Sequence, residues 1–186
     1  MAPNSVLDRS TDADLQPTPR APASCGGQEW ALRLMRQTDV MAVKTLFSKL
    51  HGFNSALDLR FALSEDWETH FDAAIQQALH SDQALCLIAR ERQSGQPCGF
   101  ILAAVHHDSL LWQHRDWVEV EALYVEDRCR GHGLATTLLT HACAWATGVG
   151  QPVVQLYVTA SNARAIRFYQ REGFRNTQAI MRKVLA

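Results

Sequence analysis

The stretch Glu126–Leu139 reads EDRCRGHGLATTLL, and it places two arginines, a histidine and two glycines ahead of an apolar run. The residues before it, WVEVEALYV at 117–125, alternate in the manner of a strand, and the residues after Gly133 repeat at helical spacing. A strand-to-helix junction exposes unpaired backbone N–H groups at the positive end of the helix dipole. The stretch therefore predicts either an anion site, which Gly131 and Gly133 would let a phosphate approach closely, or only a flexible turn before a helix.

Two familiar phosphate-binding loops do not fit this turn. A P-loop requires a lysine after its second conserved glycine, and the turn has none. A dinucleotide-binding fingerprint requires a third glycine, but Thr136 stands at that position and the turn is not in an N-terminal βαβ unit. Arg128 and Arg130 would supply cationic donors to an anion of another kind.

The totals favour one globular domain of ordinary size. The chain has 186 residues, is 47% hydrophobic and has a net charge of −1, so no overall basic field suggests nucleic acid. Its five cysteines are an odd set without a CxxC pair, which argues against a zinc ribbon or a disulfide framework and favours a reducing compartment. No apolar run reaches the roughly 20 residues of a membrane span, and we see no signal peptide. These features predict a cytoplasmic protein without metal.

The pattern along the chain predicts a mixed α/β sheet flanked by helices. Residues 1–28 are rich in proline and poor in large apolar groups, so we predict a flexible tail there and a folded domain over 29–186. A helix from residue 40, capped by Thr38 or Asp39, should break at His51–Asn54, and Ser161 should cap the last helix. The expected strands are 30–35, 84–91, 98–107, 117–125, a buried strand at 152–158, and 174–185; the expected helices are 40–50, 65–80, 133–146 and 162–172.

Two motifs in this order are similar to those of a known family. Arg130 to Ala135 fits [QR]-x-x-G-x-[GA], and NARAIRFYQREGF at 162–174 fits N-x-x-A-x-x-F-Y-x-x-x-G-F. The chain from residue 30 onward thus resembles the GNAT superfamily of N-acetyltransferases, and the expected order of elements agrees with that single-domain fold.

The resemblance implies a site for acetyl-CoA. In the family, the pyrophosphate lies on the backbone amides of this turn, and the pantetheine arm pairs with the preceding strand, where one N–H polarises the acetyl carbonyl. Asn162 would contact the cofactor, or would only cap its own helix. Carried over, the cofactor-binding residues are Leu123, Tyr124, Val125, Arg130, Gly131, His132, Gly133, Leu134, Ala135, Thr136 and Asn162.

The resemblance also implies the catalytic groups. An alkyl amine with a pKa of about 10.4 is mostly protonated at neutral pH, so a base assists its attack. Glu121 stands where many relatives have a catalytic glutamate, and Glu119 lies on the same strand face as a second candidate. Tyr169 matches the family's general acid for the thiolate. The alternatives are a solvated acidic face for the two glutamates and a core position for Tyr169.

Other residues suggest less. Cys129 lies in the turn, where arginines could lower its pKa, but no partner pattern supports a covalent mechanism. The sequence HHDSLLWQH at 106–114 predicts a polar hairpin rather than a metal site, because adjacent strand histidines face opposite ways. Trp112 and Trp117 line the acceptor pocket or cover the sheet. Candidate acceptor contacts in the family's variable segment are Phe53, Asp58, Phe61, Glu65 and Trp67.

These inferences predict an enzyme that transfers acetyl from acetyl-CoA to a primary amine of a small cationic molecule, by direct attack in a ternary complex. One alternative is acetylation of a protein N-terminus or lysine. Another is a non-catalytic acyl-CoA sensor, which would need neither Glu121 nor Tyr169. No nucleic-acid or membrane partner is expected, and the resemblance suggests a homodimer because relatives are often dimers.

Overall fold

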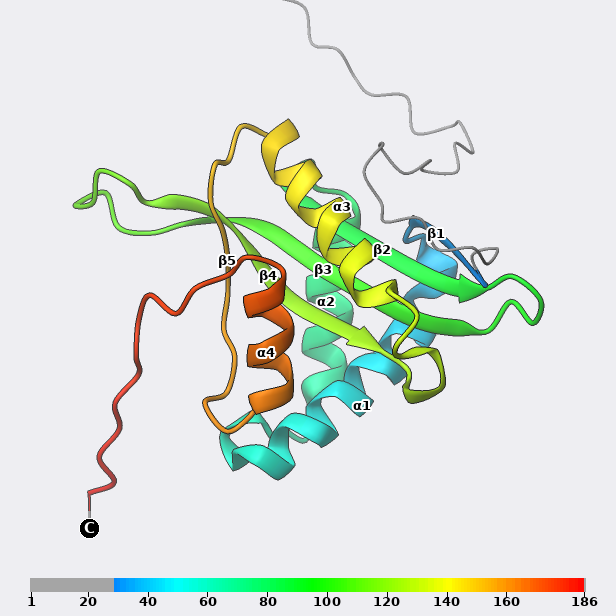
Figure 1. The fold of residues 1–186 in the computed structure, drawn as a ribbon, viewed down its shortest axis with the longest axis horizontal. Coiled ribbons are helices and arrows are strands. Elements are labelled where there is room, and N and C mark those ends of the chain that lie inside the picture. The colour runs from blue at the N-terminus through cyan, green and yellow to red at the C-terminus, as the bar shows by residue number, and fades with distance from the viewer. Residues whose placement is uncertain (1–28, 186) are drawn as a thin grey trace, which may run out of the picture.

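The computed structural model describes residues 29–185, so the predicted tail at 1–28 lies outside the described residues. This part of the chain forms a single α/β domain around a five-stranded mixed sheet (Figure 1). In chain order the elements are β1 (Trp30–Leu34), η1 (Gln37–Asp39), α1 (Val40–Leu57), η2 (Leu59–Phe61), α2 (Trp67–Leu79), β2 (Ala84–Glu91), β3 (Pro97–His107), β4 (Asp116–Val125), η3 (Asp127–Cys129), α3 (Leu134–Gly148), β5 (Val154–Leu156) and α4 (Ala163–Arg171).

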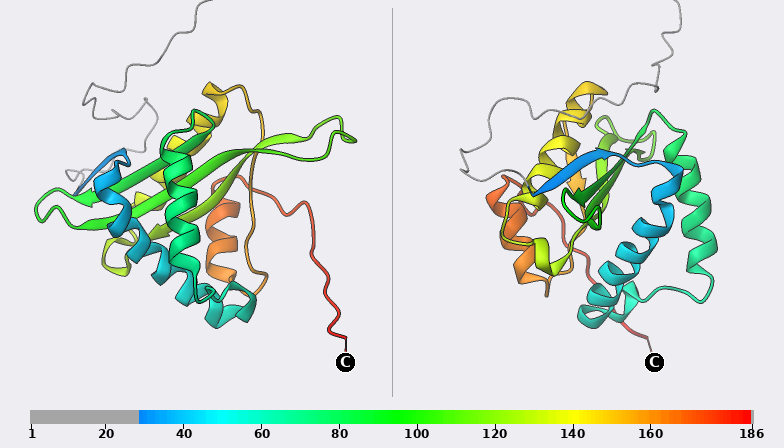
Figure 2. Two further views of the ribbon diagram at one scale, coloured as in Figure 1. Left: turned by 180° about the vertical axis from the view of Figure 1, so that it is seen from behind. Right: turned by 90° about the vertical axis from the view of Figure 1, so that its right-hand side faces the viewer.

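The strands lie in their order along the chain, from β1 to β5. The first four are antiparallel neighbours, and β5 is parallel to β4 because α3 crosses over between them. Helices α1 and α2 cover one face of the sheet, and α3 and α4 cover the other (Figure 2). This arrangement confirms the mixed, helix-flanked sheet expected from the sequence.

The sheet is buried on both faces, which explains the nearly continuous apolar runs of its central strands. Leu87 and Ile101 pack with α3, whereas Ile88 and Phe100 pack with α1 and α2, and all four are 0% exposed. These two apolar clusters, one on each face of the sheet, fix the sheet relative to both helical layers.

Asp39 has a different role from the helix cap that the sequence suggested. It precedes α1, but its side chain makes no capping bond to that helix. Instead, it accepts hydrogen bonds from Arg33 of β1 at 2.7 and 2.8 Å, from Arg90 of β2 at 2.8 Å and from the backbone N–H of Arg36 at 2.9 Å. The Asp39 carboxylate is almost fully buried, and it joins the edge of the sheet to the start of α1.

The helix break predicted at His51–Asn54 is wrong, because α1 continues to Leu57. Gly52 lies on an exposed face, where glycine costs only about 1 kcal/mol relative to alanine. His51 packs on the Phe47 ring with 4.3 Å between centroids, and its Nδ1 lies 3.3 Å from the carbonyl oxygen of Phe61. One contact within the helix and one with the segment after it therefore hold α1 through a sequence that would end it in isolation.

The two strands predicted near the C-terminal end are also corrected. The strand expected at 152–158 is reduced to β5, and none of its three residues is buried. Residues 174–185 form no strand, and Ile180, Met181 and Val184 are between 69% and 95% exposed. Both segments have strand-like composition, but strands are stabilised by neighbours, and 174–185 has no paired strand among the described residues.

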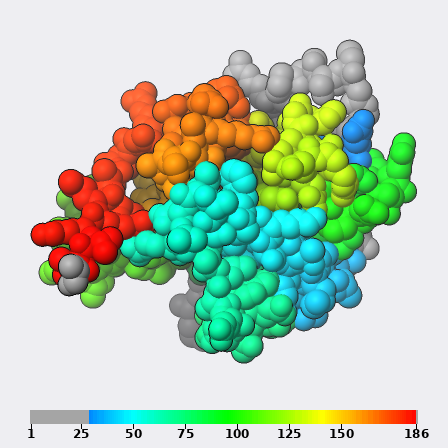
Figure 3. All heavy atoms as spheres, turned by 90° about the horizontal axis from the view of Figure 1, so that it is seen from below, coloured from blue at the N-terminus to red at the C-terminus, as the bar shows by residue number. Residues whose placement is uncertain are grey.

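The segment after α4 stays attached to the body near the connection between α1 and α2. Arg182 forms an ion pair of 2.8 Å with Asp58, the residue that follows α1. Viewed from below, this connection lies beside α4 and the C-terminal segment (Figure 3). Within residues 29–185, no helix is both long and apolar enough to cross a membrane.

Candidate active site

The turn after β4 has the backbone that close approach of an anion requires. Gly131 and Gly133 adopt φ values of +86° and +82°, in the left-handed region that favours glycine. Gly133 is the N-cap of α3 and has no side chain to satisfy the N–H groups of the first turn. No atom lies within 4 Å of the position that a Cβ would take at either glycine, so the surface of the turn is open. These features fit a pyrophosphate on the segment Arg130–Thr136.

Both arginines of the turn are engaged by neighbouring protein groups. Arg130 donates to the carbonyl of Val125 at 2.8 Å, pairs with Asp127 and lies 5.6 Å from the centroid of the Tyr124 ring. Arg128 pairs with Glu91 at the end of β2. These contacts hold the turn against the sheet.

A further contact joins the turn to the last helix. The hydroxyl of Thr136, in the first turn of α3, donates to Oε1 of Glu172 at 2.7 Å. Glu172 is the residue that ends α4. The second motif therefore contacts the residue directly after the first motif, although 36 positions separate Thr136 from Glu172.

The edge of β4 opens beside this turn. Strand β5 pairs only with Val118–Val120, so the edge of β4 from Glu121 to Val125 has no strand beside it in the described part of the chain. Leu123, Tyr124 and Val125 lie on this stretch, immediately before the turn. The main-chain groups of this stretch that do not pair with β3 can accept an extended ligand as an added strand, which fits a pantetheine arm, although Arg130 already binds the carbonyl of Val125.

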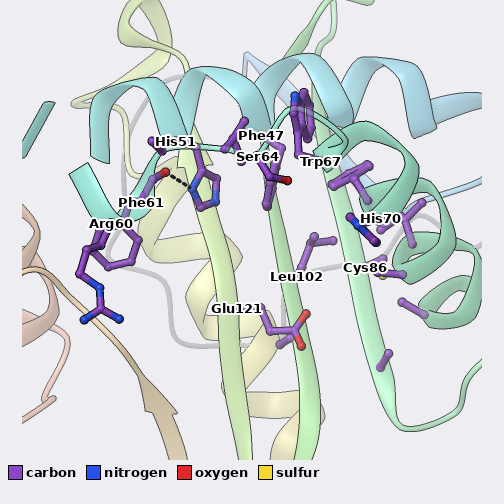
Figure 4. A pocket seen from close by; sticks show the side chains of 18 residues that line it. Phe47, His51, Arg60, Phe61, Ser64, Trp67, His70, Cys86, Leu102 and Glu121 are labelled. Atoms are coloured by element: carbon purple, nitrogen blue, oxygen red, sulfur yellow. Dashed lines mark hydrogen bonds between the residues drawn. The ribbon is translucent and has the colours of Figure 1, made fainter. Parts of the chain in front are cut away.

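Glu121 occupies a β-bulge. Leu102 of β3 pairs with Ala122 and Ala103 pairs with Val120, so Glu121 is the extra residue between them. A bulge re-aims a side chain and is common beside active sites. Here Glu121 reaches a pocket of about 640 Å³ between the sheet and helices α1 and α2 (Figure 4).

Helices and strands both contribute to this pocket. Its lining residues are Phe47, His51, Arg60, Phe61, Ala62, Leu63, Ser64, Trp67, His70, Phe71, Ala74, Ile75, Ala78, Ala84, Cys86, Leu102, Ala103 and Glu121. Of the predicted acceptor contacts, Phe61 and Trp67 line it. Asp58 lines a neighbouring hollow, and Phe53 and Glu65 line neither.

The surroundings of Glu121 raise its pKa. Desolvation by the pocket walls disfavours the charged form, although the residue keeps an exposed surface, and the nearby Glu119 carboxylate adds like-charge repulsion, while His106 acts in the opposite direction. Glu119 accepts a hydrogen bond of 3.4 Å from Nε1 of Trp117, whose ring stacks on His106 at 4.4 Å. The two glutamates are therefore neighbours, but only Glu121 lines the pocket.

Tyr169 lies in α4, packed between Phe168 and Phe174 with centroids 5.1 and 5.7 Å away. Burial raises the pKa of Tyr169 to about 12. The tyrosine lines a second hollow of about 1100 Å³ between β5, α4 and the C-terminal segment. Glu121 and Tyr169 therefore line different hollows, which share Phe61.

Asn162 caps α4, because its side chain accepts from the backbone N–H of Ala165 at 3.1 Å. The cap predicted at Ser161 is therefore wrong by one residue.

The pKa of Cys129 also differs from expectation. Burial and a contact with Glu91 raise the pKa of its thiol, although Arg128 acts in the opposite direction, so the turn does not activate it.

Sequence reasoning missed several groups in the pocket, above all Cys86, Phe47 and Phe71. Burial, with a contribution from Glu121, raises the pKa of the Cys86 thiol to about 11. Phe47 and Phe71 could have been found from their spacing, because each lies four residues from another lining residue on its helix, His51 and Trp67 respectively.

In the hairpin at 106–114, His107 pairs with Asp116 at 2.9 Å, and residues 29–185 contain no cluster of three metal-ligating side chains.

A family model described as the acetyltransferase (GNAT) family matches residues 53–174. Two curated proteins are similar over part of this region. An uncharacterised N-acetyltransferase of Methanocaldococcus jannaschii is 31% identical over 47% of this chain and 38% of its own length. A mycothiol acetyltransferase of Saccharopolyspora erythraea is 36% identical over 42% of this chain and 28% of its own length. The similarity thus spans well under half of either relative.

Solved structures share the fold. A mutant protein from Bacillus halodurans has a TM-score of 0.74 at 20% identity, over 83% of this chain and 99% of that chain. The aminoglycoside acetyltransferase AAC(6')-Iy, in complex with a bisubstrate analogue, has a TM-score of 0.66 at 21% identity over 84% and 98%. The glucosamine-6-phosphate N-acetyltransferase of Arabidopsis thaliana has a TM-score of 0.59 at 17% identity over 84% and 99%.

Proposed function

This chain belongs to the GNAT family of acetyltransferases, and from that premise we propose that it transfers the acetyl group of acetyl-CoA directly to the primary amine of a small molecule. The observation that supports this best is the bulge in β4. It presents a carboxylate of raised pKa to a pocket, next to the free edge of the same strand. A proton acceptor and a place for an extended cofactor therefore lie on consecutive residues of one strand.

Acetyl-CoA is the co-substrate in this proposal, and the turn and the strand edge hold it. The N–H groups of the turn at Gly131–Thr136 bind the pyrophosphate, and the open backbone at both glycines permits the approach. The main chain of Leu123–Val125 pairs with the pantetheine arm, and one of its N–H groups stabilises the charge that develops on the acetyl oxygen. Asn162 contributes through the helix start that it caps.

Glu121 is the general base. Its raised pKa improves its match to an amine that must lose a proton, and its exposure within the pocket gives the amine access. Glu119 tunes Glu121 through like-charge repulsion.

Tyr169 is the general acid for the departing thiolate. Its phenol keeps its proton throughout the neutral range because burial raises its pKa to about 12. The hollow that it lines adjoins the pocket of Glu121 at Phe61, so the proposal requires the thioester to lie between them.

The acceptor is a small molecule in this proposal. The pocket is confined between two helices and the sheet, and its volume of about 640 Å³ suits a compact ligand. The fold is shared with aminoglycoside and glucosamine-6-phosphate acetyltransferases, which supports a small acceptor over a protein chain.

Calorimetry with acetyl-CoA and a thiol assay for CoA release test this proposal. We expect saturable binding of acetyl-CoA and amine-dependent release of CoA from a panel of primary amines. Absence of binding would refute the cofactor assignment. Binding without release across the panel, in a protein with Glu121 intact, would instead favour a non-catalytic sensor.

A further inference from the structure

The pocket that Glu121 lines has a mostly apolar wall built from rings. Phe47 of α1 and Phe71 of α2 have centroids 4.9 Å apart, and Trp67 lies 6.0 and 6.1 Å from them. Each ring is four residues from another lining residue on its helix, so the wall is part of the regular helical surface (Figure 4). Across the pocket, Leu102 of β3 continues the apolar surface toward Glu121.

The charges of the lining residues argue against a polycation. Glu121 is the only carboxylate among them, and Arg60 places a guanidinium in the same wall. His51 and His70 also line the pocket, but an imidazole is either neutral or cationic, so neither histidine supplies a negative partner. A second ammonium group would therefore find no carboxylate in this pocket.

We propose that the acceptor is a monoamine with an apolar body, such as an aralkylamine, whose ring occupies the pocket between α1, α2 and the sheet while its amine meets Glu121. The inference rests on the proposed function and narrows its substrate class. It also narrows the cationic acceptor expected from the two glutamates to one with a single positive charge, because Glu119 does not line the pocket.

The chemistry balances with the groups already named. The amine lone pair attacks the thioester carbonyl carbon, the C–N bond forms and the C–S bond breaks. An ammonium substrate first gives one proton to Glu121, which frees the lone pair and passes that proton to solvent. The departing thiolate takes a proton from Tyr169 and leaves as CoA, and the second proton lost by the nitrogen restores the Tyr169 phenol by way of solvent. The product is a neutral amide that retains the apolar body, and it no longer offers a charge to Glu121.

A homologous series tests the apolar contacts at constant charge. In the thiol assay, kcat/KM should rise about fourfold with each methylene from propylamine to hexylamine, as burial of a CH2 group predicts. Phenylethylamine should match or exceed hexylamine. A flat series, or better turnover of a peptide amine or an aminoglycoside, would overturn the inference.

A matched pair tests the charge. Hexylamine and hexane-1,6-diamine have the same chain, and the diamine adds one ammonium group that must enter the apolar wall. We expect at least tenfold lower kcat/KM for the diamine, because an unpaired charge is costly to bury. Equal or higher kcat/KM for the diamine would contradict the inference.

Two neighbouring alanines of α2 locate the site. Ala74 lines the pocket and Ala73 does not, and both are exposed. Ala74→Phe should raise KM for phenylethylamine about tenfold by filling the space, while Ala73→Phe should leave it unchanged. Equal effects of the two variants, or no effect of either, would place the acceptor elsewhere.

A measurement of acetyl-CoA binding distinguishes a wrong substrate class from a wrong proposed function. If acetyl-CoA binds normally and only polar or polycationic amines are acetylated, the substrate class is wrong and the proposed function stands. If acetyl-CoA does not bind, the proposed function fails. The Ala74→Phe variant should keep the acetyl-CoA dissociation constant of the parent, because the cofactor turn lies on another part of the fold.

Discussion

At the scale of single residues, the proposal that Glu121 is the general base predicts how the reaction depends on pH. A base works only when it is deprotonated, so kcat/KM should fall as pH drops through the pKa of Glu121, which burial and Glu119 place above the ordinary glutamate range. Glu121→Gln should remove this acidic limb and reduce kcat by about 10²- to 10⁴-fold. The measurement is a pH–rate profile of CoA release.

Glu119→Gln is the matched control for that profile. Removing the like charge beside Glu121 should lower the pKa of Glu121, so the acidic limb should move to lower pH while most of kcat remains. An acidic limb that persists in Glu121→Gln but vanishes in Glu119→Gln would assign the base to Glu119.

Tyr169 gives a second test at this scale. Tyr169→Phe removes only the hydroxyl and keeps the ring contacts with Phe168 and Phe174, so the fold should be unaffected. We expect kcat to fall about 10²-fold with little change in KM for the amine, because a general acid acts in the transition state. Steady-state kinetics at saturating acetyl-CoA measure both constants, and an unchanged kcat would remove Tyr169 from the mechanism.

At the scale of elements, the sequence predicted four of the five strands well and located the glycine turn before α3, because both signals are local. Alternation marks β4, and paired glycines mark the turn. The bulge at Glu121 was not predictable in this way, since it depends on the register between β3 and β4. The pocket was also missed as a unit, because it joins α1, α2 and the sheet through packing that no short segment contains.

Two wrong predictions, the helix break at His51–Asn54 and the strand at 174–185, have opposite physical origins. At His51–Asn54, a glycine indicated the end of a helix, but the contact of His51 with the carbonyl of Phe61, outside α1, helps to hold the helix together. At 174–185, an alternating segment indicated a strand, but the chain supplies no paired neighbour within the described residues. Local propensity was thus overridden once by the presence of tertiary contacts and once by their absence.

The turn before α3 can be tested with a glycine variant there and a control glycine variant in α1. Gly133→Ala places a side chain at φ +82°, at a cost of roughly 1–2 kcal/mol, and adds a methyl group where the pyrophosphate is expected. Gly52→Ala changes a helical glycine with open space around it and should stabilise the fold by about 0.5–1 kcal/mol. Calorimetry should show weaker acetyl-CoA binding only for Gly133→Ala, and unchanged binding there would contradict the cofactor site.

At the scale of the whole molecule, the carboxylate of Asp39 couples the edge strand β1 and its neighbour β2 to the start of α1. Burial alone would raise the pKa of Asp39, but hydrogen bonds from Arg33, Arg90 and the Arg36 backbone outweigh it and hold the pKa below the usual range. A depressed pKa means that the contribution of Asp39 to stability is fully present above about pH 3.9, the unfolded value, and is lost as pH falls through the folded value.

Asp39→Asn should therefore lower the free energy of unfolding by about 3 kcal/mol at pH 7, because it leaves two arginines facing a neutral partner in a buried site. Urea unfolding followed by circular dichroism measures the difference, which should stay constant down to about pH 5 and shrink below about pH 4 as the parent also loses its charge. Asp66→Asn, at an exposed pair with His70, should change stability little. If the loss of unfolding free energy in Asp39→Asn grew on acidification, an ionised Asp39 carboxylate would not be what holds Arg33 and Arg90. The attachment of α1 to β1 and β2 would then need another source.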